Sequence, residues 1–206
     1  MSFITLMTST TYEFDSRGTG PALRAAELCD VKIRQAQGFA LIDLVFTCGV
    51  LGLIASIALP RLVLAKQAAG SASAIGTMRA INSAQLTYAL TCGSGFYAPS
   101  LTALGTPPPG SNEPYIGGAL GTADTVQKSG YIIRVAATPY GGSPPSCNGL
   151  GAGDTAQGFK VGADPNVPTN PRFFGTNATQ QIYEHTSSLF AGMPEVGEPA
   201  TGVPLR

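Results

Sequence analysis

An almost uncharged run of 21 residues, FALIDLVFTCGVLGLIASIAL from Phe39 to Leu59, constrains this chain more than any other feature. As a helix rising 1.5 Å per residue it would extend about 32 Å, which matches the roughly 30 Å hydrocarbon core of a bilayer. A secretory signal would have a shorter apolar core and a small-residue cleavage site after it, whereas Pro60-Arg61 follows here. The run therefore predicts a membrane-spanning helix over residues 39–60. A buried core helix is the alternative.

The segments that flank the run differ in character. Residues 1–38 are polar, mix acids with bases and show no hydrophobic period, so we interpret them as a cytoplasmic leader. Lys and Arg are equally frequent within about 20 residues of the two ends, so the positive-inside rule leaves the orientation open.

The cysteines give a better indication of orientation. Cys92 and Cys147 both follow the run, among loop residues, with no spacing typical of zinc ligands. If bonded, they would close a loop worth roughly 4 kcal/mol, and the bond would need an oxidising compartment. We therefore expect the C-terminal part to lie outside the cytoplasm. Two unrelated thiols are the alternative.

Residues 61–206 divide into a helical part and a strand-rich part. Between Lys66 and Leu90 the apolar residues follow helical spacing, and Gly93, Gly95 and Pro99 end the pattern. Gly and Pro break up the chain from there to about Gln127, and the last 16 residues read as a loose tail. The apolar stripe of the helix consists of Ile75, Met78, Ile81, Leu86 and Ala89.

Four stretches near the C-terminus have the composition of strands. We expect an α+β fold, in which the long N-terminal helix packs on a small antiparallel sheet of three or four strands. The stretches are Tyr131–Ala137, Phe159–Ala163, Arg172–Gly175 and Gln181–His185.

Composition excludes several classes of function. The 12 basic and 12 acidic residues give a net charge of zero, so no basic field for nucleic acid exists. His185 is the single histidine, which leaves little material for a histidine-based metal site or a Ser-His-Asp hydrolase. Residues 151–158, GAGDTAQG, lack both the spacing and the lysine of a phosphate-binding loop. We expect no enzyme and no obligate cofactor.

Asp43 is the one charged residue inside the apolar run. A carboxylate there costs about 2.5 to 3.5 kcal/mol on membrane-insertion scales. An ionisable group in a membrane helix normally has a partner, and no Lys or Arg lies within the run. The counter-ion must come from elsewhere.

Gly38-Phe39-Ala40-Leu41-Ile42-Asp43, followed by an apolar stretch that Pro60 closes, resembles the prepilin signature of type IV pilins and type II secretion pseudopilins. The resemblance implies a pilin-like fold and a leader that prepilin peptidase removes after Gly38, with methylation of the new amino terminus at Phe39. It also implies that Asp43, where the family usually has glutamate, neutralises the terminal ammonium of a neighbouring subunit. A buried charge is tolerated when it is paired in this way.

The same resemblance gives Gly49, Gly52 and Pro60 a role in assembly, as the place where the helix unwinds when subunits pack. Each glycine lowers helix propensity by about 1 kcal/mol, and proline removes a helical hydrogen bond. Ordinary close packing between membrane helices explains the glycines equally well.

Asp164, Asn166 and Asn170 are weak candidates for a calcium site, because some pseudopilins bind that ion in a C-terminal loop and oxygen ligands suit it. The same residues are also common in turns, which is the simpler interpretation.

These observations favour a filament subunit over an anchored binding module. The first hypothesis has the chain inserted once in the inner membrane with a cytoplasmic N-terminus, cut by prepilin peptidase, and polymerised with other copies or related pilins by inner-membrane assembly machinery. The second treats residues 39–60 as a tether for an extracytoplasmic binding module of residues 61–206.

Overall fold

The computed structural model describes residues 37–167 and 170–205, and the chain divides into two units between Ile57 and Ala58. Helix α1, Gln37–Thr91, contributes residues to both units, and each unit is described here by itself. Residues 1–36 of the predicted leader lie outside the described residues.

Helix α1 is 55 residues long and contains Pro60 in its interior. Since proline has no N–H, the carbonyl of Ser56 has no helical donor at that point. After Thr91 the N–H of Gly93 bonds to the carbonyl of Tyr88 at 2.8 Å, and Gly95 adopts a φ of 93°. The predicted end of the helix at these glycines is confirmed.

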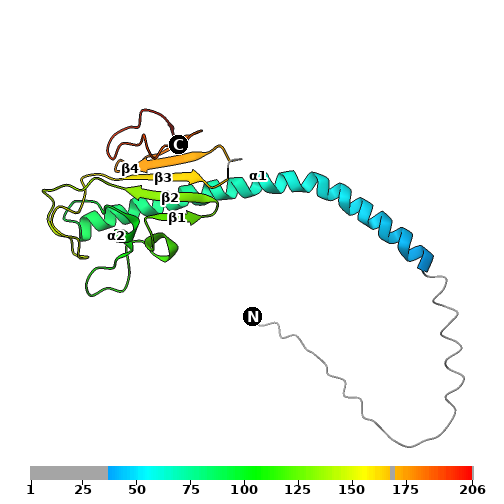
Figure 1. Cartoon of the computed structure of the whole chain (residues 1–206), viewed down its shortest axis with the longest axis horizontal. Helices are drawn as coiled ribbons and strands as arrows, with labels where there is room; N and C mark the ends of the chain where they lie inside the picture. The colour runs from blue at the N-terminus through cyan, green and yellow to red at the C-terminus, as the bar shows by residue number, and fades with distance from the viewer. Residues whose placement is uncertain (1–36, 168–169, 206) are drawn as a thin grey trace, which may run out of the picture. The chain divides into compact units, whose positions relative to one another are not determined.

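The part of α1 that belongs to the second unit packs against a β-sheet (Figure 1). Met78 and Ile81 are fully buried there, as expected, but Leu86 is 40% exposed and does not belong to the buried face. Several buried positions are polar: the side-chain amide of Gln85 bonds both the N–H and the C=O of Ala98, each at 2.9 Å. The predicted stripe is therefore correct at Met78, Ile81 and Ala89, with Ile75 packed at its border, and wrong at Leu86. The apolar spacing does not reveal the polar positions of the buried face, which consists of Gly70, Ser71, Ala74, Thr77, Met78, Ile81, Asn82, Ala84, Gln85, Tyr88 and Ala89.

The sheet is a six-stranded antiparallel meander in sequence order (Figure 1). The α+β class is confirmed, but the expected number of three or four strands is wrong. The four predicted stretches correspond to β2–β5. Strand β1 escapes the prediction because only Val126 is buried in it, and β6 because it has two residues. The strands are β1 Thr125–Lys128, β2 Tyr131–Ala136, β3 Lys160–Pro165, β4 Phe173–Asn177, β5 Ile182–His185 and β6 Val203–Pro204.

Two short helices lie in the region expected to lack regular elements: α2, Leu101–Gly105, and the 3-10 helix η1, Gly118–Gly121. Ser100 caps α2 by accepting a hydrogen bond from the N–H of Ala103. The two helices meet backbone to backbone, since a Cβ on Gly105 would lie 2.2 Å from the carbonyl oxygen of Gly121. Only glycine permits that contact.

Residues 187–198 cover the face of the sheet opposite α1. A Cβ on Gly162 would lie 2.7 Å from the Cβ of Phe190, and one on Gly175 would lie 2.5 Å from the terminal methyl of Met193. Met193 is itself buried. The interpretation of the last 16 residues as a loose tail is therefore wrong, because they form one of three packed layers and end in an edge strand.

Arg172 and Glu184 form a two-pronged ion pair beside β4 and β5. The Nε of Arg172 donates to Oε1 of Glu184 at 2.6 Å, and Nη2 donates to Oε2 at 2.9 Å. These hydrogen bonds hold the pKa of Glu184 below its ordinary value, although partial burial acts in the opposite direction. The pKa of Arg172 is raised by the same contact.

Because the folded-state pKa of Glu184 is lowered, its contribution to stability is present above the ordinary glutamate pKa of about 4.3 and disappears as the pH falls through the folded value. We expect Glu184→Gln to cost about 1 kcal/mol at pH 7, the upper range for a partly exposed pair, and almost nothing at pH 2. Urea unfolding of the full chain in detergent micelles at the two pH values measures this. An equal difference between variant and parent at both would contradict it.

Candidate assembly surface

The part of α1 from Leu41 to Leu64, called the apolar segment below, presents a continuous hydrophobic surface. Every large apolar side chain in it is 40 to 72% exposed. Since burying one such side chain gains about 1.5 to 3 kcal/mol, a surface of this size is not stable in water. Helix α1 is also long and apolar enough to cross a membrane once. The apolar segment therefore fits a helix that crosses a membrane once.

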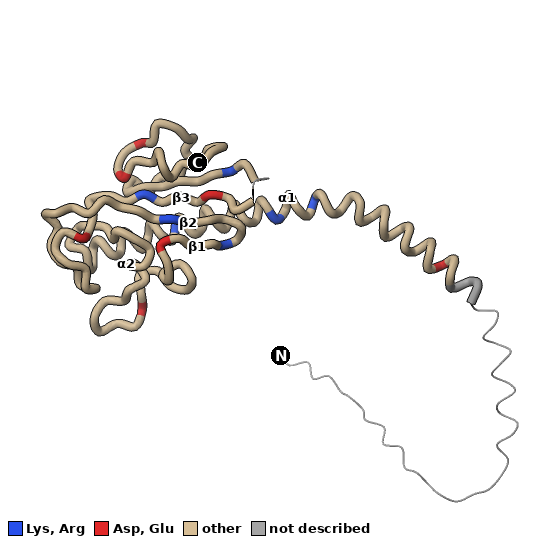
Figure 2. The backbone as a smooth tube through the Cα atoms, viewed as in Figure 1, with Lys and Arg blue, Asp and Glu red and all other residues tan. Residues whose placement is uncertain are grey.

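Asp43 lies in the apolar segment and forms no ion pair within the described parts of the chain. The next charged residue along α1 is Arg61, 18 residues later in the sequence. Figure 2 shows this uncharged stretch in tan. An external counter-ion for Asp43 therefore stays a prediction.

Gly49 and Gly52 have no packing role inside the described chain, since an added Cβ at either position would meet no atom within 4 Å. Glycine nevertheless costs about 1 kcal/mol relative to alanine in a helix interior. Helix α1 is unbroken at both glycines and at Pro60. The implied unwinding concerns packed subunits, so it stays a prediction.

Gly38 and Phe39 lie in the first turn of α1. The leader that would be cleaved from them falls almost entirely outside the described residues, so processing at this junction also stays a prediction.

The disulfide between Cys92 and Cys147 is confirmed, with the two Cα atoms 4.8 Å apart. Cys92 directly follows α1, and Cys147 lies in the long loop between β2 and β3. The N–H of Cys147 also bonds to the carbonyl of Cys92 at 3.2 Å. The bond therefore attaches this loop to the end of α1. Cys48 is a free thiol in the apolar segment.

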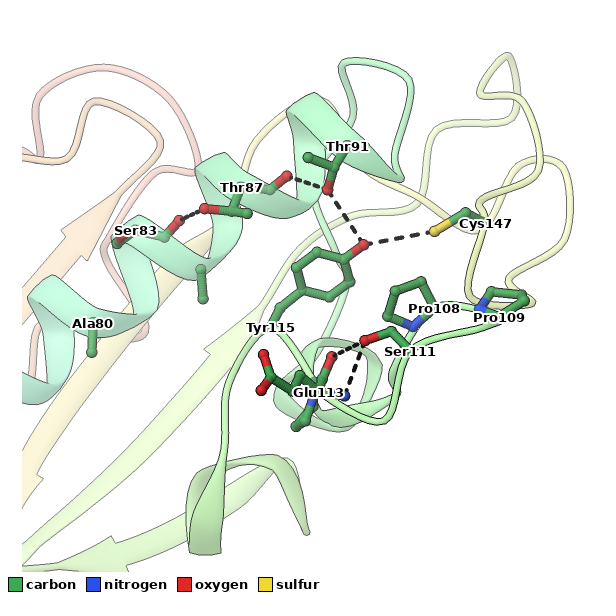
Figure 3. A pocket seen from close by; sticks show the side chains of 12 residues that line it. Ala80, Ser83, Thr87, Thr91, Pro108, Pro109, Ser111, Glu113, Tyr115 and Cys147 are labelled. Carbon is green, nitrogen blue, oxygen red and sulfur yellow. Dashed lines mark hydrogen bonds between the residues drawn. The ribbon is translucent and has the colours of Figure 1, made fainter.

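An open cleft of about 890 Å³ lies beside the disulfide, between α1 and the proline-rich loop that follows α2 (Figure 3). Tyr115 forms its inner wall, with its hydroxyl 3.3 Å from Oγ1 of Thr91 and 3.7 Å from the sulfur of Cys147. The hydroxyl of Thr87 donates to a helix carbonyl. Glu113 is the one charged side chain among the residues that line the cleft. The described lining is therefore mostly hydroxyl and apolar groups.

The three calcium candidates have other partners. Oδ2 of Asp164 accepts hydrogen bonds from Arg134, with which it forms an ion pair, and from Ser188. The side-chain amide of Asn170 donates to the hydroxyl of Tyr131, while Asn166 bonds through its backbone. A guanidinium already supplies a positive charge at Asp164, and a calcium site at these residues stays a prediction.

His185 bonds locally, as expected of a residue at a strand end. Its Nδ1 lies 2.8 Å from the hydroxyl of Ser187, and the N–H of Ser187 also donates to it. The neighbouring Glu184 is held by Arg172. No carboxylate within the described residues orients the imidazole. His185 and Ser187 therefore lack the acid that is the third member of a Ser-His-Asp system.

Sequence reasoning missed a second cleft of about 470 Å³, called the basal cleft below. It lies where α1 enters the second unit, and its walls come from α1, the β1–β2 turn and the segment after β3. No local pattern could reveal it, because these parts are far apart in the sequence. The described residues that line it are Val63, Lys66, Gln67, Gly70, Gln127, Ser129, Gly130, Tyr131, Asn166, Val167 and Asn170.

The chain matches no protein-family model, no curated protein and no solved structure.

Proposed function

We propose that this chain is a structural subunit of a type IV pilus or pseudopilus. In this proposal it is stored in the inner membrane, cleaved after Gly38 by prepilin peptidase, methylated at Phe39 and polymerised through the apolar segment. The observation that carries the proposal is the pairing of two features: an exposed apolar helix surface and, five residues after Gly38, an acid that has no counter-ion among the described residues.

The same surface can serve the stored and the assembled states. In the membrane, lipid covers the apolar segment, at a cost for Asp43 that makes insertion only moderately favourable. In a filament, the segments of neighbouring copies cover one another, and the new ammonium of one copy neutralises Asp43 of the next. The confirmed disulfide supports an extracytoplasmic position for residues 61–206, because the bond requires an oxidising compartment. Adhesion, motility, DNA uptake and protein secretion are all compatible with such a filament.

The mature amino terminus tests the proposal directly. Intact-mass and N-terminal peptide measurements on the envelope-associated protein should give a chain that begins with methylated Phe39. A chain from the same membranes that still carries residues 1–38 would contradict the proposal.

The cleft in Figure 3 favours a second candidate, a membrane-anchored extracytoplasmic binding module that forms no filament. Its size and its wall of Tyr115 and helix hydroxyls suit capture of a peptide or glycan surface. Replacing residues 39–60 by a polyleucine anchor separates the candidates. A tethered module would keep its activity, whereas a filament subunit would lose it.

A further inference from the structure

The basal cleft begins where the apolar segment ends. Val63, Lys66 and Gly70 are spaced three and four residues apart, so they share one face of α1, and all three line the cleft. Lys66 follows Leu64 by two residues, or about 3 Å along the axis. If the apolar segment spans a bilayer, as the proposed function requires, Lys66 lies at the level of the lipid headgroups.

A tight turn forms the opposite wall of the basal cleft. Ser129 and Gly130 connect β1 to β2 with φ values of 50° and 83°, the combination of a type I′ hairpin turn. The turn is fixed against α1, because Ser73 donates to the hydroxyl of Ser129 at 2.9 Å and a Cβ on Gly70 would lie 2.7 Å from the Ser129 carbonyl oxygen. The N–H of Asn166 bonds to the carbonyl of Gly130 on the other side. The wall is therefore preorganised.

Lys128 places a second positive charge beside this wall. Its cross-strand partner is Tyr131, a residue that lines the basal cleft, so the two side chains stand on the same face of the sheet. Neither Lys66 nor Lys128 forms an ion pair within residues 37–167 and 170–205, and no acidic residue appears among the described lining residues. The cleft therefore combines uncompensated positive charge with hydroxyl and amide donors.

We propose that the basal cleft binds the phosphate of an anionic phospholipid headgroup, with Lys66 in its lining and Lys128 beside the β1–β2 turn as the cationic ligands. Ser129 donates a further hydrogen bond at the cleft wall. The acyl chains of the bound lipid lie along the adjoining apolar segment beside Val63, so headgroup and tails are recognised by one continuous surface. A water-soluble phosphate would use the charges but leave the apolar part of this surface uncovered.

The proposal rests on the membrane-stored form of the proposed function and adds a lipid partner to it. A basic residue close to an anionic membrane surface gains about 1 kcal/mol, or roughly five-fold in affinity. Bound lipid would hold the subunit in the membrane before assembly and would have to leave when the subunit is extracted.

Native mass spectrometry of the full chain, titrated in detergent micelles with phosphatidylglycerol or with phosphatidylcholine of the same acyl chains, tests the proposal. The parent should retain phosphatidylglycerol preferentially. Lys66→Gln and Lys128→Gln should each weaken this binding about ten-fold, the loss expected for one direct hydrogen bond to a charged group, while leaving phosphatidylcholine binding unchanged. Circular dichroism and the intact disulfide verify that each variant is folded.

Two controls separate a site from diffuse attraction. Arg61→Gln is the control for Lys66, because it removes a charge at a similar depth on α1 from a residue that does not line the cleft. Lys160→Gln is the control for Lys128, because it removes a charge at the opposite end of the sheet from the β1–β2 turn. Both should stay within two-fold of the parent. Equal binding of the two lipids, an effect of Arg61→Gln as large as that of Lys66→Gln, or displacement of the lipid by millimolar inorganic phosphate would each overturn the proposal.

The titration uses unassembled protein, so its outcome does not depend on cleavage or polymerisation. If the parent chain prefers phosphatidylglycerol but forms no filaments, the proposed function alone is contradicted. Normal filaments from a chain without lipid preference would contradict the lipid site alone.

Discussion

Asp43→Ala is expected to give a subunit that enters the membrane and is cleaved after Gly38 but forms no filaments. Removing the carboxylate makes insertion more favourable, because a charge within the hydrocarbon costs about 2.5 to 3.5 kcal/mol. Assembly, in contrast, becomes less favourable. The ammonium of each Phe39 would enter the filament core without its partner, and an uncompensated buried charge of this kind costs about 3 to 5 kcal/mol.

A loss of about 3 kcal/mol per added subunit lowers the equilibrium constant for addition more than a hundred-fold, which is enough to abolish polymerisation at ordinary concentrations. Quantifying the protein in sheared surface filaments and in membranes, by immunoblot and electron microscopy, measures the two states separately. Asp43→Glu is the matched control: it keeps the charge with one additional methylene and should assemble. Asp43→Asn keeps the shape without the charge and should fail as Asp43→Ala does. Normal filament yield from either uncharged variant would refute the pairing role.

The sequence predicts those elements whose residues carry a strong local signal. The end of α1 is predictable because Gly93 and Gly95 stop a helix whatever surrounds them. Strands β2 and β3 are predictable because Ile133, Val135 and Val161 are β-branched and buried. These features depend on residues within a few positions of one another.

The elements that sequence reasoning misses obtain their stability from distant contacts. Strand β1 is mostly polar and exists because β2 supplies its hydrogen bonds. The buried face of α1 contains Asn82 and Gln85, which are tolerated inside only because Thr176 and Ala98 accept their amide hydrogens. A hydropathy pattern records such positions as exposed and Leu86 as buried, which is the reverse of what is observed.

The candidate site also has a part that the sequence reveals and a part that depends on distant contacts. Asp43 stands out in the sequence because a charge is unfavourable in a membrane helix, and Gly49 and Gly52 because glycine lowers helix propensity. The structure adds that no described residue pairs with Asp43 or packs against either glycine. The basal cleft instead requires Lys66, Ser129 and Asn166 to come together from three separate elements. Only the folded arrangement reveals it.

Replacing both Cys92 and Cys147 by alanine is expected to lower the free energy of unfolding by about 4 kcal/mol. The bond spans a sequence separation of 55 residues, which includes α2, η1, β1 and β2, so its loss greatly increases the conformational freedom of the unfolded chain. The folded state keeps the backbone hydrogen bond from Cys147 to Cys92 and the edge-on contact of Tyr88 with Tyr115, whose ring centres lie 5.3 Å apart. These contacts are too weak to replace a covalent link.

Because typical domains are stable by about 5 to 15 kcal/mol, a loss of this size should remove between about a quarter and four-fifths of the stability of the parent. Urea unfolding of the full chain in micelles, with and without dithiothreitol, measures the effect: reductant should shift the parent to the midpoint of the double variant and leave that variant unchanged. Cys48→Ala is the matched control, because this free thiol takes no part in the bond, and it should unfold like the parent. Equal midpoints for the parent and the double variant under oxidising conditions would show that the loop is held without the disulfide.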